Sequence, residues 1–181
     1  MKTVFHADRL DLAAFARDGA RIEGENALAR YPRLMAETRG MGGDEQVAWA
    51  AGGELRPVRG GKDDVWLHVE ARVGLPLVCQ RCLEPVTAEI TVDRQFRFVA
   101  DEETALAEDD EAEEDLLVFA RQFDLHALVE DELLMEIPAV PRHETCPSEP
   151  RLEAVDEAFV EEAAKPNPFA VLQKLRGDKK G

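Results

Sequence analysis

The sequence predicts an α+β protein in which an antiparallel β-sheet carries peripheral helices and a mobile acidic loop. Three features indicate this class: two long segments of alternating apolar and polar residues, one strongly helical segment, and a run of acids between them. The chain has 181 residues, 45% of them hydrophobic, which is enough to bury the core of one domain. We expect this domain to span residues 1–146, and residues 147–181 to form a helical extension or tail.

Short elements are predicted before residue 60. Residues 8–18 have a helical pattern that Asp8 can cap and Gly19 ends. The GMGG stretch at 40–43 is typical of a loop. The other expected elements are a weak strand over 20–28, a helical turn at 34–35 and a strand over 45–53.

The clearest pattern predicts a β-hairpin. Residues 65–77 place apolar side chains at every odd position, and residues 86–98 place them at most even positions. Two such segments are most simply adjacent antiparallel strands with one buried face. Gly74 and Pro76 predict a bulge or a sheet edge near the end of the first strand, because proline has no N–H to donate. The connection between the two strands then contains both cysteines of the VCQRC stretch.

The second half begins with an acidic run. Residues 101–115 hold ten acids and no base, so they repel one another and are predicted to form a solvated, mobile loop or linker. Strand-like composition returns at 116–123. Residues 124–138 then give the best helical pattern, with Asp124 as N-cap and Pro138 as terminator. A weaker acidic helix is expected over 151–165.

Charge is distributed unevenly. The first 100 residues hold 14 basic and 15 acidic side chains, whereas the other 81 hold 8 and 23. This acidity argues against non-specific binding of nucleic acid. A local basic face in the first half can still contact RNA phosphates or a partner, and the alternative is an ordinary solvated sheet face. The candidates for this face, three of which (72, 94 and 97) we assign to polar strand faces, are Arg56, Arg59, Lys62, Arg72, Arg81, Arg94 and Arg97.

The sequence predicts a cytoplasmic protein with no membrane contact. We see neither a signal peptide nor an apolar run of transmembrane length, and an odd number of cysteines favours a reducing compartment. The sequence contains no pattern typical of a catalytic triad, a glycine-rich phosphate loop or a pair of catalytic acids. We therefore predict no enzyme, no catalytic residues and no small-molecule substrate.

The three cysteines allow several interpretations. A redox pair is disfavoured, because the residues after Cys82 have a strand pattern, whereas a redox-active CxxC begins a helix. A CxxC on a hairpin is a common half-site for zinc, and His143 and Cys146 can supply the other half. This second half lies 61 residues beyond Cys82 and its spacing is loose. The default alternative is that the thiols are small buried apolar groups.

Several separated stretches resemble one family. They are VCQRCLEPV, the acidic run, FDLHALVEDELLMEIPAVPRHETC and KPNPFAVLQKLRG. Their order and spacing over about residues 65–176 are similar to those of the bacterial YceD family of large ribosomal RNA subunit accumulation proteins. The resemblance implies a cytoplasmic, non-enzymatic factor that supports synthesis, processing or stability of 23S rRNA. Some relatives carry more cysteines, which implies an ancestral metal site; this chain keeps at most a variant of it.

The resemblance leads us to expect a ribosome-biogenesis factor that contacts rRNA, large-subunit ribosomal proteins or both. The alternative is a zinc-stapled interaction module without an RNA role. The acidic run can hold basic ribosomal proteins or simply keep the chain soluble. The tail pattern predicts a short helix that docks on a partner or packs on its own domain. Its candidate docking residues are Pro168, Phe169, Leu172 and Leu175.

Overall fold

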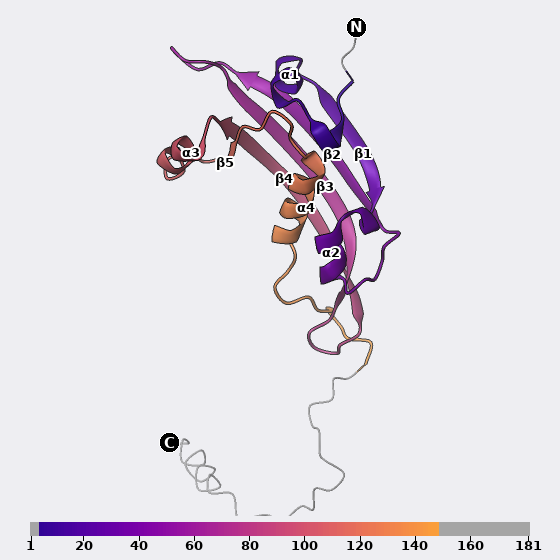
Figure 1. The fold of residues 1–181 in the computed structure, drawn as a ribbon. Helices are drawn as coiled ribbons and strands as arrows, with labels where there is room; N and C mark the ends of the chain where they lie inside the picture. Colours follow the sequence, from indigo (N-terminus) through magenta and orange to yellow (C-terminus); the bar gives the residue numbers. More distant parts are fainter. Residues whose placement is uncertain (1–3, 149–181) are drawn as a thin grey trace, which may run out of the picture. The chain divides into compact units, whose positions relative to one another are not determined.

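The computed structural model describes residues 4–148, which form an α+β fold on a five-stranded mixed sheet (Figure 1). The strands are adjacent in sequence order, and all neighbours are antiparallel except the last pair, in which β5 runs parallel to β4. The predicted antiparallel sheet is therefore confirmed except at this edge. The strands are β1 (Arg21–Ala27), β2 (Gln46–Arg56), β3 (Asp64–Val78), β4 (Pro85–Val99) and β5 (Asp115–Val118).

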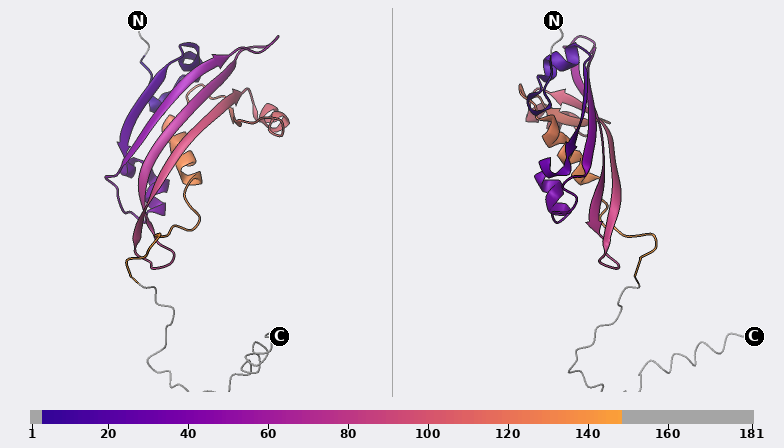
Figure 2. Two further views of the ribbon diagram at one scale, coloured as in Figure 1. Left: turned by 180° about the vertical axis from the view of Figure 1, so that it is seen from behind. Right: turned by 90° about the vertical axis from the view of Figure 1, so that its right-hand side faces the viewer.

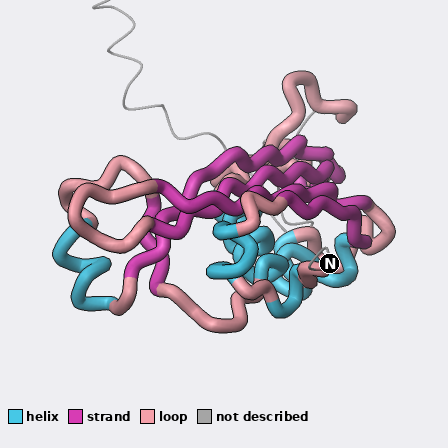
Figure 3. The backbone as a smooth tube through the Cα atoms, turned by 90° about the horizontal axis from the view of Figure 1, so that it is seen from above, coloured by secondary structure: helices cyan, strands magenta, loops and turns pink. Residues whose placement is uncertain are grey.

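Helices cover one face of the sheet. The edge-on view in Figure 2 places α1, α2 and α4 on the same side of the sheet, and the view from above in Figure 3 shows the helices gathered on one side of the strands. The first helix is capped by Asp11 and not by Asp8: the Asp11 carboxylate accepts a hydrogen bond from the Ala14 amide at 3.0 Å. The helices are η1 (Ala7–Arg9), α1 (Leu12–Arg17), η2 (Leu28–Arg30), α2 (Pro32–Glu37), α3 (Glu102–Glu108) and α4 (Leu125–Met135).

None of the helices within residues 4–148 is both long and apolar enough to cross a bilayer. The longest of them, α4, begins at the predicted N-cap: the Asp124 carboxylate accepts from the Ala127 amide at 3.0 Å.

The acidic run is more ordered than its composition predicts. Residues 102–108 form α3, and the Asp101 side chain caps this helix by accepting from the Thr104 amide at 2.8 Å. Hydrogen bonds from Thr104 also lower the pKa of Asp101. Acids near a helix N-terminus are stabilised by the helix dipole, so the first half of the run favours a helix. The run as a whole forms the crossover that a parallel β4–β5 pair requires.

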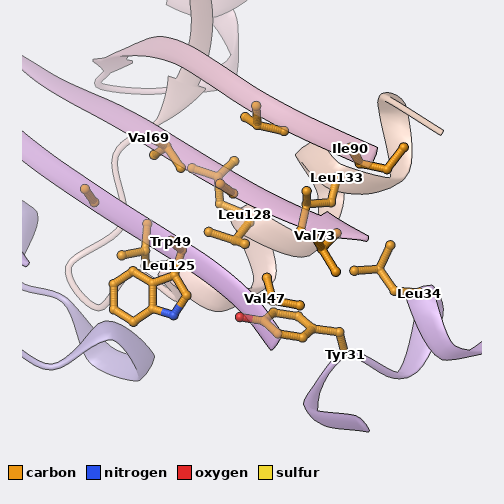
Figure 4. Close-up of a cluster of buried hydrophobic side chains, with 14 of the residues drawn as sticks. Tyr31, Leu34, Val47, Trp49, Val69, Val73, Ile90, Leu125, Leu128 and Leu133 are labelled. Atoms are coloured by element: carbon orange, nitrogen blue, oxygen red, sulfur yellow. The ribbon is translucent and has the colours of Figure 1, made fainter. Parts of the chain in front are cut away.

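A single apolar core lies between the sheet and the helices (Figure 4). The odd positions of β3 and the even positions of β4 supply one side of it, as the alternation predicts. Leu125, Leu128 and Leu133 of α4 pack against them, while Tyr31 and Leu34 enter from the start of α2. The side chains of Phe15, Val69 and Leu75 are fully buried. Burial of this apolar surface is the main term that stabilises the fold.

The β3–β4 hairpin extends beyond the rest of the sheet. The pairing of β2 with β3 ends at Arg72, so within residues 4–148 the segment 73–78 pairs only with β4. Pro76 therefore lies at an edge of the sheet, where its missing N–H interrupts no hydrogen bonding between strands. The pairing of β3 with β4 runs through this position without a break, so there is no bulge. This projecting hairpin carries the CxxC stretch at its tip.

Gly53 allows α1 to approach β2 closely. A Cβ at this position would lie 2.5 Å from Cδ1 of Phe15 and 3.0 Å from the backbone nitrogen of Ala16. We expect Gly53→Ala to lower the free energy of unfolding by about 1–3 kcal/mol, the usual cost of overpacking. Urea denaturation measures this change. Gly52→Ala is the matched control because a Cβ there has no neighbour within 4 Å, and equal stability of the two variants would contradict the close approach.

Candidate metal centre

A tight turn brings the two hairpin cysteines to the same side. The Cys79 amide donates to the Glu84 carbonyl, and the Leu83 amide donates to the Cys79 carbonyl, each at 2.9 Å. Leu83 has a φ of 64°, in the left-handed region that an apolar residue seldom adopts. Such strain persists only where the surrounding structure fixes it. The turn therefore holds the CxxC in a defined conformation.

The segment after α4 returns to this turn. The Gln80 amide donates to the Pro141 carbonyl at 2.8 Å. The Arg81 guanidinium donates to the carbonyls of His143 at 3.0 Å and Glu144 at 3.2 Å. These contacts bring His143 and Cys146 beside the hairpin cysteines, although more than 60 residues separate the two halves.

Four side chains converge at one point with the dimensions of a tetrahedral metal site. The ligand atoms of Cys79, Cys82, His143 and Cys146 all lie within 4.8 Å of one another. Sγ of Cys79 lies 3.9 Å from Sγ of Cys146, and Sγ of Cys82 lies 3.4 Å from Nδ1 of His143. Standard zinc bond lengths give tetrahedral edges of about 3.8 Å between sulfurs and about 3.6 Å between sulfur and nitrogen. The set therefore fits zinc in size and in ligand type.

Neighbouring groups orient the ligands. Nε2 of His143 lies 3.0 Å from the Pro85 carbonyl oxygen, which can only accept a hydrogen bond. In the neutral ring Nε2 therefore carries the proton, and the lone pair of Nδ1 faces Cys82 and is available to a metal. Nε of Arg81 donates to Sγ of Cys146 at 3.0 Å and offsets the negative charge that clustered thiolates bring.

The thiols differ in acidity. Burial opposes ionisation of Cys79, but backbone N–H groups of Cys82, His143 and Arg81 outweigh it and lower its pKa to about 5. Burial, together with the sulfurs of Cys146 and Cys79, raises the pKa of Cys82 to about 11. A metal ion supplies the positive charge that allows several adjacent thiols to ionise together, so the donor set suits a cation.

Most of the predicted basic face is engaged within the fold. Arg81 donates to Sγ of Cys146 and to the backbone carbonyls of His143 and Glu144. Arg97 is only 15% exposed and binds Glu108 at 2.7 Å and Glu114 at 2.5 Å. Arg94 occupies an even position of β4, on the helix-covered side and not on the polar face, and pairs with Glu136 beside α4 at 2.9 Å.

The other candidates are placed differently. Arg56 pairs with Glu54, and its guanidinium lies 3.7 Å from the centroid of the Trp66 ring. Arg59, Lys62 and Arg72 are exposed and form no ion pair with the part of the chain that the structure describes. The four predicted docking residues of the tail, and the predicted helix over 151–165, lie outside the described residues.

Comparison with known proteins identifies the family. The family model described as "Large ribosomal RNA subunit accumulation protein YceD" matches residues 67–176, more than half of the chain. The chain belongs to the YceD family. The YceD match starts within β3 and includes all four residues of the cluster. The predicted family assignment is thus confirmed.

A Haemophilus influenzae protein named "Large ribosomal RNA subunit accumulation protein YceD" is 34% identical over 112 residues. The matched region covers 59% of this chain and 63% of that YceD protein, so the chain spans less than two thirds of the relative's length. No solved structure matches the chain significantly.

Proposed function

We propose that this protein is a non-catalytic ribosome-biogenesis factor that supports synthesis, processing or stability of the 23S rRNA of the large subunit. The observation that carries the proposal is the YceD match over residues 67–176, together with a relative named for accumulation of the large ribosomal RNA subunit. In this role the protein acts in the cytoplasm on rRNA, large-subunit ribosomal proteins or both.

The geometry of the cluster supports a structural role. Catalytic zinc sites keep one position open for water or substrate, whereas structural sites use four protein ligands. Cys79, Cys82, His143 and Cys146 provide four. We propose that they hold one Zn²⁺ ion, which would tie the segment after α4 to the β3–β4 hairpin. A zinc-stapled module with no RNA role is not favoured, because the family is named for rRNA accumulation.

Partner contacts in this proposal fall on groups that the fold leaves free. Arg59, Lys62 and Arg72 are exposed cations without an ion pair among the described residues. The arginines at 56, 81, 94 and 97 already bind other groups and would have to release them first. Docking of the tail through Pro168, Phe169, Leu172 and Leu175 stays a prediction.

Deletion of the gene tests the proposed function. We expect the ratio of 23S to 16S rRNA, and of large to small subunits on a sucrose gradient, to fall in the deletion strain. Expression of the wild-type protein from a plasmid should restore both ratios, which controls for effects on neighbouring genes. Wild-type ratios in the deletion strain would contradict the proposal.

A further inference from the structure

The face of the sheet opposite the helices, seen in the left view of Figure 2, is free of helices within residues 4–148. It carries two depressions, and a third adjoins them at the start of β5, where Arg94 also lines it. The largest has a volume of about 770 Å³. Its floor is formed by small side chains of β2, among them Ala48 and Ala50, and longer side chains of β1 and β3 flank it. Glu23 of β1 and Glu70 of β3 are both opposite Ala50 of β2, so they lie on the two sides of this depression.

The dimensions of this trough suit an extended chain. Neighbouring strands lie about 4.8 Å apart, so side chains of β1 and β3 flank a channel about 10 Å wide. A single polypeptide strand fits this width, and a helix with its side chains does not. Arg21 lines both the first and the second depression, and Trp66 lines both the second and the third, so the three adjoin one another.

The depressions are acidic. Together they are lined by eight carboxylates and four guanidinium groups. Several charges are paired within the face: Arg21 binds Glu70 at 2.6 Å, and His68 contacts Asp93 at 2.6 Å. The remaining acids give the face a net negative charge. The eight carboxylates are Glu23, Glu25, Glu54, Glu70, Asp93, Glu113, Glu114 and Asp115.

Glu23 and Glu25 are exposed at the β1 side of the trough and form no ion pair with any described residue. They project from alternate positions of one strand, on the same face, about 7 Å apart. An extended chain repeats its side chains at the same interval. Two cations at alternate positions of such a chain can therefore meet both carboxylates at once.

An aromatic group lines the other end of the trough. The Trp66 ring lies beneath the Arg56 guanidinium, and its buried Nε1 has no hydrogen-bond partner among the described residues. Tryptophan and arginine supply much of the binding energy at protein interfaces. The stacked Arg56–Trp66 pair is therefore a second feature of this face, besides its acids, that suits a protein partner.

We infer that this open sheet face binds an extended, positively charged segment of a protein partner. The free Arg72 also lines the largest depression, but carboxylates outnumber guanidinium groups there and would repel phosphates, so a protein partner suits this face and RNA does not. The inference names a partner class for the proposed function and rests on that function for its biological setting. The binding itself can be measured without it.

Binding of a short fluorescent peptide of alternating lysine and threonine to the full-length protein tests the inference. We expect saturable binding at low salt that weakens by about fivefold or more in the Glu23→Gln/Glu25→Gln variant, the effect of losing two exposed charge pairs. Ala50→Trp, which fills the trough without changing charge, should also weaken binding. The matched control is Glu37→Gln/Glu102→Gln, which removes two acids outside the three depressions and should leave the affinity unchanged.

Failure of the peptide to bind would overturn the inference, as would equal weakening by the trough and control pairs. Binding of a short single-stranded RNA that Ala50→Trp abolishes would overturn it in favour of an RNA surface. These results are separate from the gene deletion. Absent peptide binding with a reduced 23S rRNA level would remove only this inference, and normal rRNA in the deletion strain would remove only the proposed function.

Discussion

Replacing Cys82 with serine is expected to lower the affinity for zinc by more than about 100-fold. Changing a residue that only hydrogen-bonds to a metal ligand already lowers metal affinity by about 10–100-fold, and removal of a ligand itself should have a larger effect. The Cys82 sulfur lies 3.4 Å from the His143 nitrogen, and a serine hydroxyl would bind the ion far more weakly. Once the ion leaves, residues 141–146 are held at the hairpin only by hydrogen bonds. Competition with a chromophoric chelator measures the affinity.

The same variant should loosen the hairpin locally. The Gln80 amide, which donates to the Pro141 carbonyl at 2.8 Å, should exchange its hydrogen faster, whereas amides of the core around Val69 should not change. Thr145→Ala is the control, because this side chain is exposed and adjacent to the cluster without belonging to it. Unchanged exchange at Gln80 in Cys82→Ser would show that no metal joins the two segments.

Replacing Glu130 with alanine is expected to destabilise the fold by about 2–3 kcal/mol. Glu130 is 6% exposed, and its carboxylate accepts from the backbone amides of Arg33 at 2.7 Å and Leu34 at 3.3 Å. It also accepts from Nε of Arg33 at 3.1 Å. These amides belong to the first turn of α2, which has no intrahelical partners for them, so the substitution leaves them unpaired in a buried setting. Thermal and urea unfolding measure the loss.

Asp131→Ala separates this effect from simple loss of charge. Asp131 also pairs with Arg33, but both side chains are about half exposed. Exposed ion pairs contribute about 1 kcal/mol or less, so this variant should be almost as stable as the wild type. Equal destabilisation by the two substitutions would contradict a specific role for the hydrogen bonds from the start of α2 to Glu130 of α4.

The hairpin and the main helix could be predicted because local patterns specify them. The alternation in β3 and β4 is long, and a shift by one residue would expose every apolar side chain, so the register is strongly determined. The same pattern assigns Arg94 to the buried series. We grouped it instead with the polar residues by its charge, and the structure shows that position on the strand decides which face it joins.

Features that depend on distant contacts were harder to predict. Nothing near Glu130 in the sequence distinguishes it from the other acids of α4; only its packing against α2 does. Likewise, Arg81 looks like a surface cation until the segment after α4 lies beside it. The parallel β5 depends on the crossover through α3, which the composition of the acidic run conceals.

The four candidate metal ligands could be predicted only in part. Residue types and short spacings indicate Cys79 with Cys82 and His143 with Cys146 as two half-sites. Only the fold brings Sγ of Cys82 to 3.4 Å from Nδ1 of His143. The hydrogen bonds from Gln80 and Arg81 that dock them involve backbone carbonyls, which carry no sequence signature.

The mass of the natively purified protein tests the metal centre most directly. Native mass spectrometry should show one zinc ion for each chain, accompanied by the loss of thiol protons. Treatment with a chelator, or the Cys82→Ser substitution, should shift the mass to that of the metal-free chain. A wild-type protein that remains metal-free after purification and after incubation with zinc would contradict the metal centre.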